Sequence, residues 1–192
     1  RSIIGCRKCF DNLLEIFIKT ENFDGLFLKL VEVLEMSGLE VINANISTSK
    51  NKAVASNTFI SKFSHHDRQL NNSEIQELTK KINDNFFNFS RKKDKTVKKK
   101  KKIKSFNQPL KISNIEEKRK KRNFLTIETS DSPGLLIKIA KVLHENGTSI
   151  YSARINTLGD RVEDTFEIED MTLSSVSQRK IEKISNSLKE II

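Results

Sequence analysis

Residues 123–157 read NFLTIETSDSPGLLIKIAKVLHENGTSIYSARINT. A β-prone run precedes the loop Asp131-Ser132-Pro133-Gly134, and apolar residues at helical spacing follow that loop as far as Asn146. Gly147 stands where helices commonly end in a left-handed residue. The stretch therefore predicts a strand, a helix and a strand over 123–129, 134–146 and 149–157.

The chain continues as a hairpin and a second helix. Leu158-Gly159-Asp160 is a turn signal with a glycine available for a positive φ, and alternating apolar residues follow it over 162–168. A last helical stripe occupies 181–191. The predicted order of this half is βαββα.

The same order of elements occurs earlier in the chain. We predict strands at 13–19, 41–48 and 53–63 and helices at 25–38 and from Asn72 to about Phe86. A shift of 109 residues gives ten identities in the twenty-nine positions 20–48, and a shift of 107 pairs Thr58-Phe59 with Thr165-Phe166. Because Gly25 and Gly38 fall on Gly134 and Gly147, the two halves are an internal repeat.

The repeated order predicts an α+β protein of two tandem ferredoxin-like (βαββαβ) domains, in which helices cover one face of an antiparallel sheet. We expect residues 1–12 to be an N-terminal remnant, 13–89 and 123–192 to be the two domains, and 90–122 to be a basic linker. In that linker the run PLKIS, 109–113, is the predicted late strand of the first domain. The second sheet is then either completed by the other repeat or left with an open edge. The first residue is Arg1, so we expect the chain to be part of a longer product.

The positive charge is concentrated in one segment. The chain has 35 Lys and Arg against 25 Asp and Glu, and sixteen of the basic residues lie in 91–122. The flanking halves are mildly acidic, unlike a nucleic-acid-binding domain with a basic folded face. The lysine run at 91–104 either binds nucleic acid or an acidic surface by counterion release or is a solvated, self-repelling linker, which we favour. No apolar run is long enough for a membrane helix and no secretory leader is evident, which predicts a cytoplasmic protein without a membrane partner.

The most specific local signal is the loop before the helix of the second half. Ser132 is expected to cap the helix, Pro133 to occupy its first turn, and Gly134 to let a ligand approach the backbone. A helix start with exposed N–H groups suits a carboxylate. The candidate ligand-binding residues are this loop and its counterpart in the first half: Asp131, Ser132, Pro133, Gly134, Leu135, Asn22, Phe23, Asp24, Gly25 and Leu26. The alternative is that both loops are simply good helix starts.

Two further motifs give little support for a metal or catalytic site. His66-Asp67 resembles the pair of metal-dependent phosphohydrolases, but the chain has only three histidines, so we interpret the pair as a solvated loop. Cys6 and Cys9 are half of a zinc ribbon without a second half. No phosphate loop and no activated nucleophile are recognisable. We predict no catalytic residue, metal site or cofactor in this chain.

Longer motifs carry a family resemblance. Phe124 to Glu128, the loop DSPGLL and the run SARINTLGDRVEDTFEIED at 152–170 resemble the C-terminal ACT domain of the bifunctional uridylyltransferase/uridylyl-removing enzyme family. In the first half, EIFI, Ala44-Asn45-Ile46 and Thr58-Phe59-Ile60 are similar to its penultimate ACT domain.

The resemblance implies a regulatory glutamine sensor. In that family, nucleotidyltransferase and His-Asp phosphohydrolase domains, both absent here and expected to use Mg²⁺, attach and remove uridylyl groups on the nitrogen-regulatory protein PII. Glutamine acting through the ACT pair favours removal. The alternative reading is a stand-alone tandem ACT regulator of the glycine-cleavage repressor type.

The first half departs from the family pattern at two positions. Asn57 stands where the family usually has an acidic residue before Thr-Phe, and Asp24 replaces the usual proline before the first helix. The resemblance therefore implies ligand binding more strongly for the second half. There we expect the ligand's carboxylate on the backbone N–H groups after Pro133 and its amino group near Asp131 or near strand carbonyls.

Overall fold

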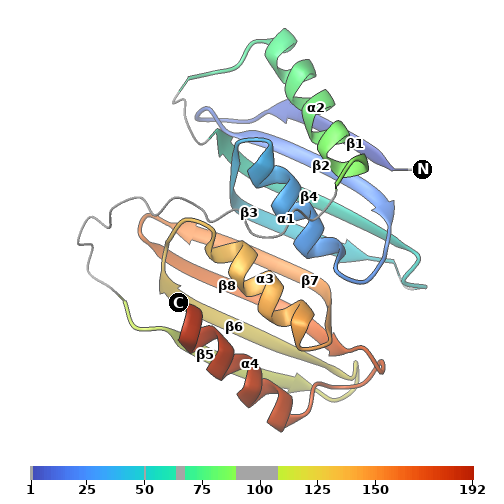
Figure 1. The fold of residues 1–192 in the computed structure, drawn as a ribbon, viewed down its shortest axis with the longest axis vertical. Helices are drawn as coiled ribbons and strands as arrows, with labels where there is room; N and C mark the ends of the chain where they lie inside the picture. Colours follow the sequence, from blue (N-terminus) through green and yellow to red (C-terminus); the bar gives the residue numbers. More distant parts are fainter. Residues whose placement is uncertain (1, 50, 64–67, 90–107) are drawn as a thin grey trace.

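The computed structural model describes residues 2–49, 51–63, 68–89 and 108–192, so the lysine run at 91–104 and the pair His66-Asp67 lie outside the described residues. Within these ranges the helices and strands follow the predicted order closely (Figure 1). They are β1 (Ile3–Lys8), β2 (Leu14–Glu21), α1 (Leu26–Met36), β3 (Leu39–Thr48), β4 (Val54–Phe63), α2 (Asn72–Phe87), β5 (Lys111–Glu117), β6 (Arg122–Ser130), α3 (Leu135–Glu145), β7 (Thr148–Leu158), β8 (Arg161–Asp170) and α4 (Gln178–Ile191).

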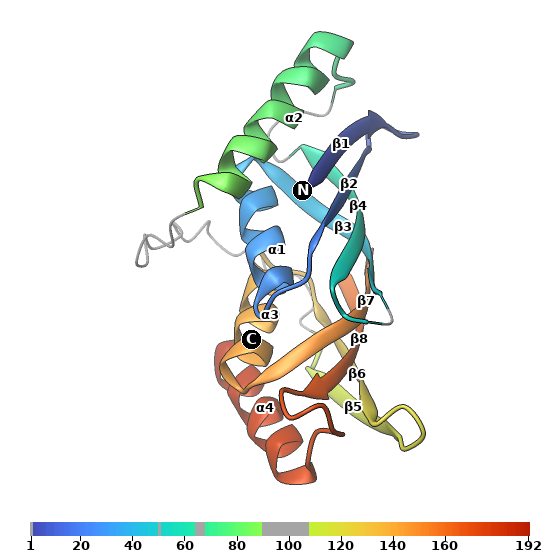
Figure 2. The ribbon, with the colours of Figure 1, turned by 90° about the vertical axis from the view of Figure 1, so that its right-hand side faces the viewer.

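The strands form one eight-stranded sheet in the order β1-β2-β4-β3-β7-β8-β6-β5. All neighbouring strands are antiparallel. The four helices lie on one face of the sheet, and the other face has no helix over it (Figure 2). This is the predicted α+β architecture of two tandem ferredoxin-like halves.

Each half differs from the predicted βαββαβ order in the origin of its outermost strand. Residues 3–8, expected to be part of an N-terminal remnant, form β1 and pair with β2. The strand predicted at 109–113 forms as β5, but the expectation that it completes the first half is wrong, because β5 pairs with β6. The turn between β5 and β6 is only four residues long, so this hairpin closes at a low entropic cost. The edge strand of the second half of the sheet is thus β5, which directly precedes β6 in the chain.

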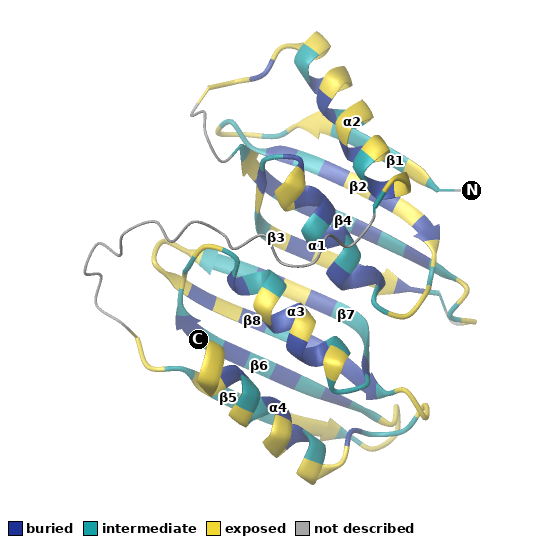
Figure 3. Ribbon diagram, viewed as in Figure 1, coloured by how far each residue is buried: buried dark blue, intermediate teal, exposed yellow. Residues whose placement is uncertain are grey.

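Alternating burial explains why the strands form as they do. In β2 the side chains of Leu14, Ile16 and Ile18 are buried under the helices, and those between them are more exposed. Successive side chains of a strand point to opposite faces, so this apolar row faces the helices and the intervening row faces the uncovered side. Figure 3 shows buried and more exposed residues alternating along the strands. The helices contribute matching stripes, with Leu30, Val33, Leu34, Ile139, Leu143, Ile184 and Leu188 fully buried.

Contacts between the halves are few and specific. In the sheet, β3 and β7 pair at Asn43–Asn156, Ala44–Ile155 and Asn45–Arg154. On the helical face the Phe27 ring meets the Phe166 ring edge-on, with 6.0 Å between centroids. At the turn between β3 and β4, Lys52 Nζ lies 2.5 Å from a carboxylate oxygen of the buried Glu169. In the described ranges, no helix is long and apolar enough to cross a membrane.

Candidate ligand site between the two halves

The two predicted loops have the same geometry. Gly25 and Gly134 precede α1 and α3 with φ of 77° and 74°, in the left-handed region. The N–H of Leu26 donates to Phe23 O, and the N–H of Leu135 donates to Ser132 O, each at 3.1 Å.

The predicted capping role of Ser132 is therefore wrong, because Gly134 is the N-cap residue and no side chain caps α3. Pro133 lies in the turn before the helix and not in its first turn. Each glycine is required by its own backbone angle, which side-chain-bearing residues adopt at a cost.

A hollow lies beside the first of these loops, at the junction of the two halves. Asn22, Phe23, Gly25 and Leu26 line it from the first half, together with residues of β3 and β4. The second half contributes the end of α3 and the start of β7. Its cavity volume is about 30 Å³, far below the roughly 300 Å³ or more of typical ligand pockets. An amino acid therefore fits there only if a lining side chain moves.

Asn57 supplies an unusual group to this hollow. Its side chain is 0% exposed, and its Nδ2 donates to Ile18 O across the β2–β4 pair at 3.0 Å. The carbonyl of Ile18 can only accept, so the amide is fixed with Oδ1 turned away from it. That Oδ1 is buried and has no hydrogen-bond partner. Leaving a buried acceptor unpaired costs roughly 1–3 kcal/mol, so this atom is a site for a donor.

His144 closes the hollow from the second half. Its Nδ1 lies 3.5 Å from Asp24 Oδ1, close enough for an ion pair when the imidazole is protonated, yet it makes no hydrogen bond. A Cβ added at Gly25 would lie 3.0 Å from His144 Cε1. The loop of the first half and α3 of the second half are thus in contact across the site.

The equivalent position in the second half carries a different chemistry. A shift of 107 places Asp164 on Asn57, and Asp164 is 1% exposed. Its Oδ1 accepts the N–H of Asn156 at 3.1 Å. Burial raises the pKa of Asp164 to about 7, with the Asn156 bond opposing the rise and the Asp131 carboxylate adding to it. The pKa of Asp131 is itself raised, first by partial burial and then by Glu40. The second loop is therefore an acidic environment.

The predicted site residues are thus divided between two places. Asn22 to Leu26 lie at the hollow, with Asp24 reaching His144, whereas Asp131 to Leu135 lie near Asp164 and Glu40 on the other side of the junction. Sequence reasoning treated Asn57 only as a departure from the family pattern, one that made ligand binding by the first half less expected, and gave His144 no role in binding. The signal at Asn57 was its alignment with Asp164, because a buried polar residue at the same position in both repeats calls for a polar partner.

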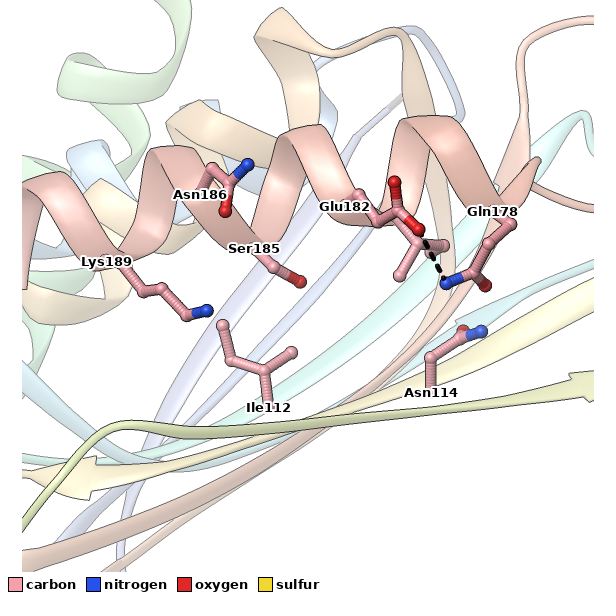
Figure 4. Close-up of a pocket in the computed structure, with 8 residues that line it drawn as sticks. Ile112, Asn114, Gln178, Glu182, Ser185, Asn186 and Lys189 are labelled. Carbon is pink, nitrogen blue, oxygen red and sulfur yellow. Dashed lines mark hydrogen bonds between the residues drawn. The ribbon is translucent and has the colours of Figure 1, made fainter.

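A larger groove of about 510 Å³ runs between α4 and β5 (Figure 4). Ile112 and Asn114 point toward it from the strand, and Gln178, Ser185 and Lys189 lie along the helix. Two of its amides are already engaged, since Asn114 Oδ1 accepts from Asn123 and Gln178 donates to Glu182, and the third, Asn186, is exposed to solvent. None of the predicted ligand-binding residues lies there. The small hollow, by contrast, is lined by residues with buried polar atoms that have no hydrogen-bond partner.

No cluster of three or more metal-ligating side chains occurs in the described part of the chain. Cys6 and Cys9 are free thiols, each half-buried at or beside β1. Burial raises the pKa of Cys6 to about 11. A thiol with a raised pKa is a weak nucleophile near neutral pH.

The fold defines a tandem ferredoxin-like module whose two halves share one sheet and enclose a small polar hollow. No protein-family model matches the chain. Similar proteins are the bifunctional uridylyltransferase/uridylyl-removing enzymes: that of Psychrobacter sp. (strain PRwf-1) is 28% identical over 179 residues, covering 93% of this chain and 20% of that protein. The enzyme of Vibrio campbellii is 26% identical over 182 residues, 91% of this chain and 21% of that protein. The enzyme of Pseudoalteromonas translucida is 26% identical over 189 residues, 98% of this chain and 21% of that protein.

The chain thus spans about a fifth of the length of the relatives it matches, and these homologues confirm the family resemblance that the motifs predicted. The crystal structure of aspartate kinase from Synechocystis is 12% identical with a TM-score of 0.48, covering 94% of this chain and 26% of that one. That likeness is too weak to argue from.

Proposed function

We propose that this chain is the amino-acid-sensing regulatory region of a bifunctional uridylyltransferase/uridylyl-removing enzyme, with glutamine as its effector and the protein PII as the substrate of the whole enzyme. The observation that carries the proposal is the hollow at the predicted loop, where two buried polar atoms have no hydrogen-bond partner. The similarity to the bifunctional enzymes supports the identity of the parent protein. A cytoplasmic location and a requirement of the catalytic domains for Mg²⁺ belong to the same proposal.

The position of the hollow suits a sensor. Its walls come from both halves, so a ligand bound there contacts both, with the Asp24–His144 contact and the 43% exposed Phe23 beside it. A ligand changes a conformational equilibrium only by its difference in affinity for the two states. Binding between the halves supplies such a difference, and couplings of roughly 1–3 kcal/mol are typical.

Thermal unfolding of the 192-residue chain tests the proposal. Ligand at about 100 times its dissociation constant adds roughly 2.7 kcal/mol, which for a protein of this size raises the unfolding midpoint by about 5–10 °C. We expect that rise with glutamine and not with glycine, serine or glutamate. A cooperative transition that no amino acid shifts would contradict sensing within these residues.

A further inference from the structure

The two repeats differ at the one buried polar position that the sheet places beneath each loop. In the first half it is Asn57, paired in the β2–β4 ladder with Ile18. In the second half it is Asp164, paired in the β6–β8 ladder with Ile127. The positions are structurally equivalent, yet the Asp164 carboxylate already accepts the N–H of Asn156, whereas Asn57 Oδ1 accepts nothing. Asn57 Oδ1 is thus a buried acceptor without a partner, whereas Oδ1 of Asp164 already has one.

The Asn57 side chain offers the hollow a hydrogen-bond acceptor and no donor. Its amide nitrogen is held by Ile18 O, so the group offered to the hollow is a neutral carbonyl oxygen. A neutral acceptor attracts an ammonium or amide N–H and repels a carboxylate. The first turn of α1 also borders the hollow through Leu26, Phe27 and Leu28. The N–H of Leu26 donates to Phe23 O, but those of Phe27 and Leu28 have no intrahelical acceptor. The hollow therefore combines donors for a carboxylate with an acceptor for an ammonium.

We propose that Asn57 is the specificity-determining residue of this site, its Oδ1 accepting a hydrogen bond from the α-ammonium group of an amino acid whose carboxylate lies at the start of α1. This inference rests on the proposed sensing function and extends it, since it names the ligand group that the hollow requires. It also assigns binding to the first half, because Asn57 Oδ1 is buried without a partner, whereas Oδ1 of the equivalent Asp164 already accepts the N–H of Asn156.

The test compares two ligands that differ only in the α-amino group, glutamine and glutaramic acid, by titration calorimetry on the wild-type chain and on Asn57→Leu. Leucine has a similar size and no acceptor. We expect wild type to bind glutamine at least tenfold more tightly than glutaramic acid, and Asn57→Leu to bind the two within about twofold. Equal discrimination in both proteins overturns the inference.

A matched control comes from the same strand. Ser61 is fully buried on the same face of β4, its hydroxyl has no hydrogen-bond partner, and it does not line the hollow. Ser61→Ala is expected to keep the wild-type discrimination. Wild type that binds no amino acid would instead contradict the proposed function, so the two failures are distinguishable.

A second variant keeps the inference testable if Asn57→Leu does not fold. Asn57→Asp places a carboxyl where the equivalent Asp164 titrates near neutral pH. Binding of an ammonium group favours the ionised form, so glutamine binding to Asn57→Asp is expected to release a proton, seen as a binding enthalpy that depends on the buffer's ionisation enthalpy. Glutaramic acid is expected to release none. Proton release that is the same with both ligands contradicts an ammonium contact.

Discussion

Asp164 is a buried carboxyl group whose protonation should set the pH dependence of stability. Its folded pKa of about 7 exceeds the ordinary value of about 3.9 in unfolded chains. The folded state therefore holds a proton that the unfolded state has lost, and the free energy of unfolding falls as the pH rises from about 4 to about 7. The loss is on the order of a few kcal/mol.

Asp164→Asn should abolish that slope and stabilise the protein at pH 8. The amide can repeat the arrangement of Asn57, because Ile127 stands opposite position 164 as Ile18 stands opposite 57. The measurement is urea unfolding at pH 4, 6 and 8. Asp160→Asn, at an exposed turn, is the control, and parallel slopes for wild type and Asp164→Asn would contradict the assignment.

The two loop glycines offer a matched pair of substitutions. Gly25→Ala and Gly134→Ala both place a side chain at a positive φ, at a cost of roughly 1–2 kcal/mol each. A Cβ at position 25 also meets the His144 ring at 3.0 Å, whereas a Cβ at position 134 meets nothing within 4 Å. Gly25→Ala should therefore destabilise by roughly 1 kcal/mol more, since overpacking is costly.

Unfolding midpoints in urea measure this difference. Combining Gly25→Ala with His144→Ala should remove the excess cost relative to His144→Ala alone.

Strand β1 was not predicted from the sequence. Its six residues contain a glycine and end in two basic residues, and no helix of its own half precedes it, so the pattern of a strand was weak. Its position is set by pairing with strand β2, which would otherwise be the edge of the sheet, over six residue pairs. Edge strands gain their stability from the sheet that they join, and this information is not local.

The register of β1 predicts unequal effects at neighbouring positions. Ile4 pairs with the buried Ile18 and packs against the core, whereas Ile3 is 57% exposed. Ile4→Asn should destabilise the protein by roughly 1–3 kcal/mol, and Ile3→Asn by less than about 0.5 kcal/mol. Chemical denaturation of both variants checks this. The reverse order would mean that β1 lies on the sheet with the opposite face inward.

The two halves should unfold as one unit despite their narrow junction. Three residue pairs between β3 and β7 join them, together with contacts that include Phe27–Phe166, Lys52–Glu169 and Asp24–His144. Ala44 and Ile155 form the apolar centre of the junction, 1% and 2% exposed. A buried, unpaired charge there would cost several kcal/mol, so Ala44→Glu should separate the single calorimetric transition into two.

Asn45→Glu is the control for that experiment. Residue 45 is exposed on the uncovered face and stands opposite Arg154, so the new carboxylate gains a partner and one transition should remain. A single transition in Ala44→Glu would show that the helical contacts suffice to couple the halves.

By itself, the sequence determined the repeat, the βαββα order of each half, the helices on one face and the two glycine loops. These follow from local periodicity and from backbone angles, which neighbouring residues set. Tertiary structure alone decided that β1 and β5 occupy the sheet edges, that β3 pairs with β7, and that Asn57 and His144 meet beside the first loop. Pairing partners and unmet hydrogen bonds depend on groups far apart in the chain, and a one-dimensional pattern does not record which of them are brought together.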